Sequence, residues 1–153
     1  MALDSGNATR DGRFVISTDP ARLDLDVIHG YLTRSYWSPG VSRETVAASL
    51  RGSICFGLFD GDEQIGFARV VTDGATFAYL ADVFVLESHR GRGLATWFME
   101  VVMAHPDLRG IRRWMLVTAD AHGLYRKVGF TEPSKPERIM EKLLPDPYGA
   151  SRG

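Results

Sequence analysis

Apolar residues along the chain fall into short runs that alternate with stretches of helical spacing. Residues 13–18 form a first strand candidate, and Asp19-Pro20 then gives a helix start, since Asp is a favoured N-cap and Pro fits the first helical position. Helical spacing follows in Leu23, Val27, Ile28, Tyr31 and Leu32. Beyond a break at residues 36–40, Ser42 is expected to cap a second, short helix that ends near Leu50.

The middle of the chain has the pattern of strands. Residues 54–59 and 64–71 are apolar runs on either side of the turn-forming segment 60–63, which predicts a hairpin. Residues 75–85 are almost continuously apolar, and this predicts a central strand that is covered on both faces.

The last third alternates helical and strand patterns. An amphipathic helix is predicted by the spacing of Leu94, Trp97, Phe98, Val101 and Val102. A strand is expected at residues 114–118, a short helix at 121–128 with Gly129 as its C-cap, and a strand at 138–144 that closes the sheet.

These elements predict one α/β (α+β) domain over residues 13–145, in which a mixed sheet carries helices on its faces. A chain of 153 residues is long enough for one such domain and too short for two ordinary ones. Residues 1–12 are small and polar, so they are expected to form a flexible leader, and residues 146–153 a flexible tail.

Charge and cysteine content narrow the class of protein. The formal net charge of -1 argues against a nucleic-acid partner and against a polybasic membrane protein. The one cysteine, Cys55, stands in an apolar run, which indicates a buried thiol and excludes an internal disulfide or a multi-cysteine zinc site. No apolar run is long enough to span a bilayer, and no metal-binding cluster is apparent. A soluble, cytoplasmic protein is the expectation.

One segment, ESHRGRGLA at residues 87–95, lies where a strand becomes a helix. Helix N-termini attract anions, and glycines let the backbone approach a phosphate closely. By itself the segment is either such an anion site or a tight turn on a basic surface. A dinucleotide fingerprint would need a third glycine where Thr96 stands, and a P-loop spacing is absent.

A second segment, DAHGLYRKVGF at residues 120–130, follows the expected strand at 114–118. Together the two segments resemble the GNAT superfamily of acetyl-CoA-dependent N-acyltransferases. The pyrophosphate signature of that family, Arg/Gln-x-x-Gly-x-Gly/Ala, corresponds to Arg90, Gly93 and Ala95. Its later pattern corresponds to Ala121, Tyr125, Lys127, Gly129 and Phe130. One departure is Glu87, where many members carry proline.

The resemblance implies a mostly antiparallel sheet with a splayed central strand pair and acetyl-CoA in the gap. It implies that the pantetheine arm pairs with backbone groups of Phe84 and Val85, which is reasonable because pantetheine contains amides that a free strand edge can satisfy. The residues implied to bind the pyrophosphate are Arg90, Gly91, Arg92, Gly93, Leu94, Ala95 and Thr96.

Three residues are candidates for catalysis. Tyr125 matches the tyrosine that is proposed in the family to protonate the leaving thiolate, the alternative being that it packs and positions the cofactor. Asp82 is an acidic residue in an otherwise apolar strand, so it is either the general base or the ion-pair partner of Arg69 on the neighbouring strand. His122 lies at i, i+3 from Tyr125 and either relays a proton, contacts substrate or is a capping or surface residue.

The acceptor site is expected to come from the first two helices and their loop, where Tyr31, Tyr36 and Trp37 either contact the amine or pack as a lid. The resemblance implies an N-acetyltransferase in which a primary amine of a small molecule or peptide attacks acetyl-CoA directly in a ternary complex. The alternative is a non-catalytic acyl-CoA-binding sensor, although Tyr125 favours the enzyme. Many relatives are dimers, so a homodimer is one arrangement that the resemblance allows.

Overall fold

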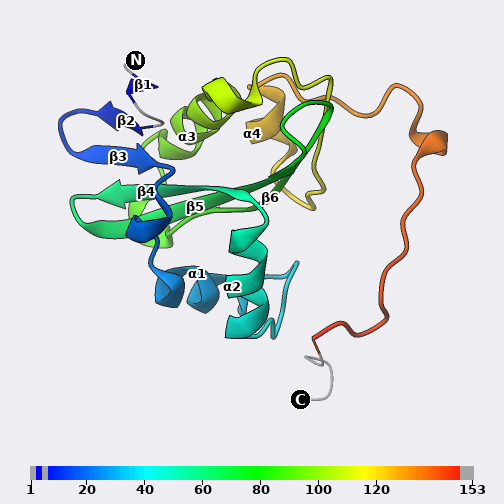
Figure 1. The fold of residues 1–153 in the computed structure, drawn as a ribbon, viewed down its shortest axis with the longest axis horizontal. Coiled ribbons are helices and arrows are strands. Elements are labelled where there is room, and N and C mark those ends of the chain that lie inside the picture. The colour runs from blue at the N-terminus through cyan, green and yellow to red at the C-terminus, as the bar shows by residue number, and fades with distance from the viewer. Residues whose placement is uncertain (1–2, 5–6, 149–153) are drawn as a thin grey trace.

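The computed structural model describes residues 3–4 and 7–148, which form one α/β fold with helices on both faces of a mixed sheet (Figure 1). Strands within these residues follow one another across the sheet in chain order: β1 (Leu3–Asp4), β2 (Asn7–Arg10), β3 (Phe14–Ser17), β4 (Ile54–Asp60), β5 (Glu63–Thr72), β6 (Phe77–Val85) and β7 (Arg113–Met115). Neighbouring strands are antiparallel except for β6 and β7, which are parallel.

The four α-helices of the described residues divide between the two faces of the sheet (Figure 1). They are α1 (Leu25–Leu32), α2 (Arg43–Arg51), α3 (Leu94–Met103) and α4 (His122–Arg126). Short 3-10 turns are η1 (Pro20–Arg22), η2 (Glu87–His89), η3 (Pro106–Leu108) and η4 (Pro136–Arg138). No helix of residues 3–4 and 7–148 has the length and apolar character needed to cross a membrane.

The N-terminal segment differs from the expected flexible leader, because β2 lies within it and pairs with β3. Asp11 and Gly12 both have positive φ, of 55° and 63°, and Arg13 N–H donates to the Arg10 carbonyl, which makes a tight hairpin turn. Ala8 of β2 is fully buried, and it pairs with Ile16 of β3. The Asp11-Gly12 pair is a sequence signal for a hairpin turn. It was missed because residues 7–10 before it lack the apolar run of a typical strand.

The first helix begins later than the sequence indicates. Asp19 does cap a turn, since its carboxylate accepts from Ala21 N–H, but only the 3-10 turn η1 follows before Leu23 becomes extended. Asp24 then acts as a second N-cap, accepting from the N–H groups of Asp26 and Val27. The second helix agrees with expectation, because Ser42 caps α2 by accepting from Thr45 N–H.

The predicted hairpin is confirmed as β4 and β5, and the apolar run that follows is β6. β6 contains a bulge in which Asp82 and Val83 stand opposite Ala68 alone, since Phe67 pairs with Phe84 and Arg69 with Ala81. Asp82 carries the bulge with φ of 58°, in the left-handed region that Asp and Asn tolerate better than most residues.

β7 is shorter than the strand expected at residues 114–118. It pairs with β6 only between residues 77–79 and 113–115. Beyond Tyr79, β6 runs on through the bulge to Val85, whereas residues 116–118 are not in a strand. The two strands therefore splay apart, as the resemblance implies.

The strand expected at residues 138–144 is not formed, so that prediction is wrong for the described structure. Residues 136–138 form η4, and the chain then runs extended and apart from the sheet (Figure 1). The segment has strand-like apolar character, but it pairs with no strand of residues 3–4 and 7–148. Of the expected tail, residues 149–153 lie outside the described part of the chain.

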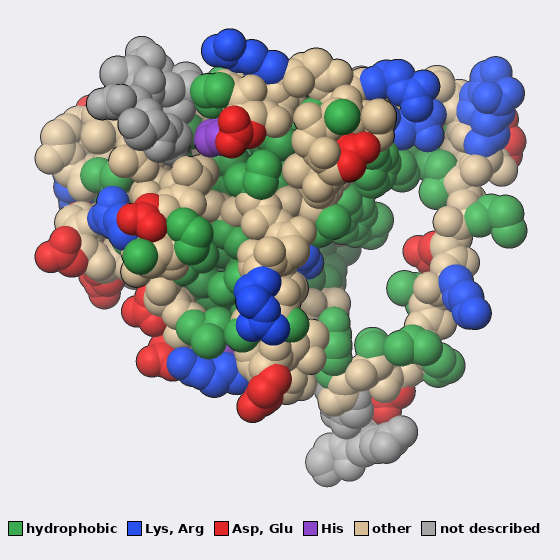
Figure 2. Space-filling model, viewed as in Figure 1, with side chains coloured by type: hydrophobic (Ala, Val, Ile, Leu, Met, Phe, Trp, Pro, Cys, Tyr) green, Lys and Arg blue, Asp and Glu red, His purple; other side chains and the backbone are tan. Residues whose placement is uncertain are grey.

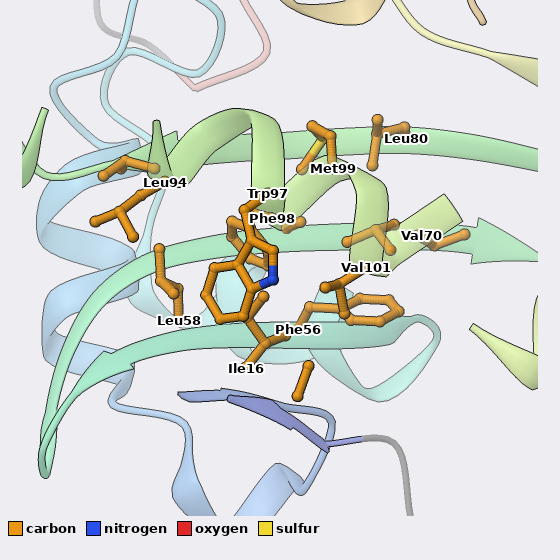
Figure 3. Close-up of a cluster of buried hydrophobic side chains, with 14 of the residues drawn as sticks. Ile16, Phe56, Leu58, Val70, Leu80, Leu94, Trp97, Phe98, Met99 and Val101 are labelled. Atoms are coloured by element: carbon orange, nitrogen blue, oxygen red, sulfur yellow. The ribbon is translucent and has the colours of Figure 1, made fainter. Parts of the chain in front are cut away.

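Helix α3 supplies one half of the main core. Figure 3 shows side chains of β3 to β6 (Ile16, Phe56, Leu58, Val70 and Leu80) packed with side chains of α3 (Leu94, Trp97, Phe98, Met99 and Val101). On the opposite face α1 and α2 pack over a smaller cluster that includes Cys55, Phe67 and Phe84. Cys55 is buried, as expected, and burial raises the pKa of its thiol to about 11.

Candidate active site

The Gly-Arg segment forms a loop directly before α3. Gly91 and Gly93 have φ of 80° and 72°, and Gly93 is the N-cap of the helix. Only glycine adopts this left-handed backbone without strain. Within the described chain no side chain caps the first amides of α3. The loop therefore presents free helix N–H groups and their partial positive charge to an anion.

Arg90 fixes this loop to its surroundings. Its Nε donates to the carbonyl of Val85 at 3.1 Å, and its Nη2 donates to the Tyr31 hydroxyl at 2.8 Å. These bonds tie the loop to the end of β6 and to α1. Arg92 is also exposed, and in the described residues its guanidinium has no hydrogen-bond or ion-pair partner, so it is the freer of the two.

A third arginine at the loop, Arg10 of β2, was missed by the sequence analysis because it falls in the expected leader. Its Nη1 donates to the Gly93 carbonyl at 3.2 Å, and its guanidinium lies 5.8 Å from the ring centroid of Trp97. The hairpin that forms β2 thus adds a cationic group at the start of α3.

The other end of the loop is held by His89. His89 Nε2 and Asp60 Oδ2 share a hydrogen bond of 2.9 Å, and Arg13 donates to both oxygens of the same carboxylate at 2.8 and 2.7 Å. Hydrogen bonds from Arg13 and then His89 lower the pKa of Asp60 well below its usual range. His89 therefore braces η2 rather than standing free at the surface.

The outer edge of β6 opens where β7 ends. Phe84 and Val85 are buried at 4% and 8% exposure, and their backbone lies past the last pair with β7 at Tyr79. A strand edge that is free of a neighbouring strand leaves N–H and C=O groups for another extended amide chain. The loop before α3 lies at the end of this edge.

Asp82 has a partner for each carboxylate oxygen. Oδ2 accepts from Arg69 Nε at 2.8 Å in an ion pair, and Oδ1 accepts from the indole Nε1 of Trp37 at 3.0 Å. The ion pair that the sequence analysis gave as one alternative is therefore present. Because the bulge places Asp82 beyond the last β6–β7 pair, its side chain belongs to the splayed part of the sheet.

The loop between α1 and α2 spans the gap. Tyr36 is 56% exposed, and its hydroxyl accepts from Ala119 N–H at 2.9 Å, while the adjacent Trp37 reaches Asp82. Tyr31 stacks on Phe84 with ring centroids 4.1 Å apart and an interplanar angle of 9°. The three predicted acceptor residues thus gather at one end of the gap.

Tyr125, on α4, lies on the side of β7. Burial, with smaller contributions from Tyr36 and Asp120, raises the pKa of its phenol to about 12. Its ring makes an edge contact with Phe130 at 6.0 Å between centroids. The phenol is therefore a neutral O–H group at physiological pH, next to the tyrosine of the spanning loop.

His122 is less enclosed than the other two catalytic candidates. It is exposed and lies near Glu132, whose pKa is lowered first by hydrogen bonds from the backbone and from Arg126 and only slightly by His122. It does line the same groove as Tyr125, a space of about 980 Å³ between the end of the sheet, α4 and residues 128–139.

A second cavity, of about 710 Å³, lies between α2, the start of β4 and η3, and contains none of the predicted site residues. Among the residues described by the structure, no group of three His, Cys, Asp or Glu side chains is placed to hold a metal ion.

Comparison with known proteins identifies the family. Residues 51–132 match the model of the acetyltransferase (GNAT) domain. A protein of Gibberella zeae classed as an acetyltransferase is 35% identical over 144 residues, covering 79% of this chain and 80% of that protein. A crystal structure from Xanthomonas campestris pv. campestris, assigned to the same family, superposes with a TM-score of 0.85 at 48% identity, covering 88% of this chain and 96% of that one.

The chain belongs to the GNAT acetyltransferase family. This acetyltransferase is accordingly an acyltransferase enzyme, and the resemblance inferred from the two sequence motifs is confirmed. Members of the family use acetyl-CoA as co-substrate. A more distant structure, from Clostridium acetobutylicum, is described with acetyl-CoA and has a TM-score of 0.61 at 15% identity, covering 85% of this chain and 94% of that one.

The residues of this acetyltransferase fit that co-substrate. Gly91 and Gly93 leave the face of the loop open, since a Cβ at Gly91 would meet no atom within 4 Å and one at Gly93 would meet only the Arg10 guanidinium, at 3.7 Å or more. Free helix amides and Arg92 offer positive charge to a pyrophosphate.

Proposed function

We propose that this acetyltransferase transfers an acetyl group to a primary amine of a small molecule or a peptide, by direct attack of the amine in a ternary complex. The observation that carries the proposal is the arrangement at the gap between β6 and β7. Asp82 borders the gap on β6, Tyr125 lies beside the end of β7, and the loop with Tyr36 and Trp37 crosses between them.

In this proposal the loop before α3 binds the pyrophosphate of acetyl-CoA. The residues are those of the motif, Arg90, Gly91, Arg92, Gly93, Leu94, Ala95 and Thr96, with Arg10 as an added cation. Arg90 acts mainly as a brace, because it already donates to Val85 and Tyr31. Phe84 and Val85 offer the strand edge for the pantetheine amides.

Tyr125 is the proposed general acid. A leaving thiolate needs a proton, and the phenol of Tyr125 holds one at neutral pH because its pKa is raised to about 12. Proton transfer from a positioned acid contributes about 10²–10⁴ in rate. The contact with Phe130 holds the ring in place without removing its donor.

Asp82 is the proposed acceptor of the amine's proton, directly or through water. Each of its oxygens already accepts one hydrogen bond, and a carboxylate oxygen has a second lone pair for another donor. Arg69 and Trp37 fix its orientation. His122 is the weaker candidate, because it is exposed and no hydrogen bond in the described residues fixes its side chain beside the gap between β6 and β7.

The acceptor is proposed to enter beside Tyr31, Tyr36 and Trp37. Aromatic faces attract a protonated amine and also cover apolar carbon, so this loop suits an amine that carries an apolar or aromatic group. The competing function, a non-catalytic acyl-CoA sensor, needs the loop before α3 but has no use for a half-buried phenol and a carboxylate across the gap.

The test is a screen in which free coenzyme A is measured with a thiol reagent while the enzyme meets acetyl-CoA and panels of aryl-alkylamines, polyamines, amino acids, aminoglycosides and peptides. We expect turnover with at least one primary amine, and mass spectrometry should show 42 Da added at its nitrogen. Tight acetyl-CoA binding without turnover over the whole panel would favour the sensor, and acetylation at oxygen would contradict the amine proposal.

A further inference from the structure

The cavity of about 710 Å³ lies outside the proposed active site, and its walls are mainly apolar. Residues 20–25, helix α2 and the start of β4 supply these walls through Pro20, Leu23, Leu25, Ala47, Leu50 and Ile54. Ligand sites in proteins measure about 300–1,000 Å³ and are lined mostly by apolar side chains. The cavity therefore has the size and the walls of a site for a small organic molecule.

One buried polar side chain, that of His105, opens into this cavity. His105 is 5% exposed, and its Nδ1 accepts a hydrogen bond from Asp107 N–H at 3.1 Å. Nε2 has no hydrogen-bond partner in the described residues, although every fully buried polar side-chain atom among them has one. Nε2 is therefore accessible, and because His105 lines the cavity, Nε2 faces that space.

The contacts of His105 decide what Nε2 offers to a ligand. Since Nδ1 accepts from Asp107 N–H, the proton of the neutral ring lies on Nε2, which is then a donor. Burial lowers the pKa of His105, and Asp107 opposes this shift in part, so the ring is neutral at neutral pH. An edge contact with Phe56, at 5.3 Å between ring centroids, holds the ring. A molecule in the cavity thus meets a fixed N–H donor and needs an acceptor for it.

Two charged side chains also line the cavity, and both are exposed, so they lie at its rim. Arg51 is the last residue of α2, and its guanidinium has no hydrogen-bond or ion-pair partner in the part of the chain that the structure describes. Asp107 carries the opposite charge. In the view of Figure 2, positive and negative side chains alternate over the surface formed by α1 and α2, and neither sign gathers into a patch. The rim therefore favours one negative charge over a polyanion.

The wall of the cavity also belongs to a chain of hydrogen bonds that ends at Asp82. Ser53 lines the cavity, and its hydroxyl donates to the Ser49 carbonyl at 2.8 Å and accepts from Arg69 Nη1 at 3.1 Å. Arg69 Nε in turn donates to Asp82 Oδ2 at 2.8 Å. A hydroxyl has a single hydrogen and rotates to suit its partners. An acceptor in the cavity competes with the Ser49 carbonyl for that hydrogen and so changes the oxygen that Arg69 meets.

We propose that this cavity binds a small carboxylic acid with an apolar body, and that its occupancy alters the Arg69–Asp82 ion pair through Ser53. The carboxylate accepts from His105 Nε2 and is neutralised by Arg51, while the apolar body covers the walls. The cavity would then be an effector site, separate from the loop before α3. Its effect on catalysis rests on the proposed role of Asp82, whereas binding and the change at Asp82 do not.

Calorimetry tests the binding with hexanoate, octanoate, phenylacetate and 4-phenylbutyrate. The matched probes are the neutral amide of the tightest binder, which lacks the charge, and succinate, which lacks the apolar body and carries two charges. We expect at least one monocarboxylate to bind, and both matched probes to bind about tenfold more weakly or less. Saturating coenzyme A should leave this affinity unchanged. Absence of binding, equal affinity for acid and amide, or loss of binding with coenzyme A would each overturn the site.

Substitutions place the acid in the cavity. His105→Gln can return a side-chain N–H near the position of Nε2, whereas His105→Asn keeps an acceptor for Asp107 N–H but does not reach that position. We expect the affinity to stay within about threefold in His105→Gln and to fall about tenfold in His105→Asn. Arg51→Gln, at an exposed position, should lower the affinity for the acid about tenfold and leave that of the amide unchanged.

Arg112→Gln is the control, because Arg112 is exposed and does not line the cavity. Circular dichroism confirms that each variant is folded. Wild-type affinity in both His105→Asn and Arg51→Gln would mean that the acid binds elsewhere.

The Trp37 indole gives a readout at Asp82 that needs no activity, since its Nε1 donates to Oδ1 of that carboxylate. The chain has three tryptophans, so Trp37→Phe identifies the Trp37 indole signal in a ¹⁵N NMR spectrum. Titration with the tightest binder should shift this signal in wild type. Ser53→Ala should bind the acid within about threefold and leave the Trp37 signal in place. An unmoved signal in saturated wild type, or an equal shift in Ser53→Ala, would contradict transmission through Ser53.

Discussion

Trp37 donates a hydrogen bond from its indole Nε1 to Oδ1 of Asp82 at 3.0 Å. The tryptophan stands in the loop between α1 and α2, and the aspartate stands in the bulge of β6, 45 residues away in sequence. The adjacent Tyr36 accepts from Ala119 N–H beyond β7. Two neighbouring aromatic residues thereby join the two walls of the gap, and the loop is held where an acceptor would enter.

Replacing Asp82 tests its proposed role as proton acceptor. Asp82→Asn keeps the backbone, because asparagine also tolerates φ of 58°, and removes the basic oxygen. We expect kcat to fall by about 10²–10⁴ with little change in the affinity for acetyl-CoA. Steady-state kinetics with an amine from the screen measures both.

The matched control for Asp82 is Trp37→Phe, which removes the hydrogen bond to Oδ1 but leaves the carboxylate. It should lower kcat by about tenfold or less, since one hydrogen bond is worth about 1 kcal/mol. Wild-type kcat in Asp82→Asn would reduce Asp82 to the partner of Arg69.

Tyr125→Phe removes the proposed acid and keeps the ring against Phe130. We expect kcat to fall by about 10²–10⁴ while acetyl-CoA binding, followed by calorimetry, stays within a few-fold. Tyr36→Phe is the control, as it removes a nearby phenol of the spanning loop. Equal losses in both variants would indicate that the phenols act through packing.

Alkaline pH reports on the same phenol. The folded-state pKa of Tyr125 is about 12, above the ordinary value of 10.0, so the stability that it contributes is complete below pH 10 and is lost as pH rises toward 12. Tyr125→Phe should therefore lose less stability than wild type between pH 10 and 12 in urea unfolding. Parallel curves for the two proteins would show that the phenol is not desolvated.

Gly93→Ala tests the loop before α3. Alanine in the left-handed backbone at φ of 72° costs about 1–2 kcal/mol, so the variant should lower Tm and bind acetyl-CoA more weakly. Gly52→Ala is the control, because Gly52 has φ of -98° and open space around it. Thermal shift with acetyl-CoA should be large for wild type and Gly52→Ala and smaller for Gly93→Ala.

If acetyl-CoA raised the Tm of Gly93→Ala as much as that of wild type, the loop before α3 would not be part of the cofactor site. In that case the positive φ of Gly93 would only allow α3 to begin there, and Arg10 and Arg92 would not bind the pyrophosphate at this loop.

Cys55 provides a test of burial in the smaller core. A thiol pKa of about 11 against an ordinary 9.0 leaves about 100-fold less thiolate at pH 8 than in the unfolded chain. Alkylation by iodoacetamide, followed by mass spectrometry, should be at least 100-fold slower in native protein than in urea. Equal rates would mean that the cluster under α1 and α2 opens readily.

Elements that depend on residues close together in the chain could be predicted from the sequence alone. The hairpin of β4 and β5, the helix that follows Gly93, and the cap at Ser42 each depend on apolar spacing and turn residues that lie within a few positions of one another. The motifs at residues 87–95 and 120–130 also identified the family, because glycine and arginine spacing at a helix start is a local requirement of phosphate binding.

Features that depend on contacts between residues far apart in the sequence could be seen only in the tertiary structure. Residues 7–10 become a strand only because β3 offers an edge, and residues 116–118 cease to be one because the bulge at Asp82 turns β6 away. The ion pair of Asp82 with Arg69 and the hydrogen bond from Trp37 are contacts between remote segments that only the tertiary structure shows, and the role of Asp82 as a base stays a proposal. Apolar spacing at residues 138–144 specifies a strand, but a strand exists only where an edge lies beside it, and contacts between remote segments set that edge.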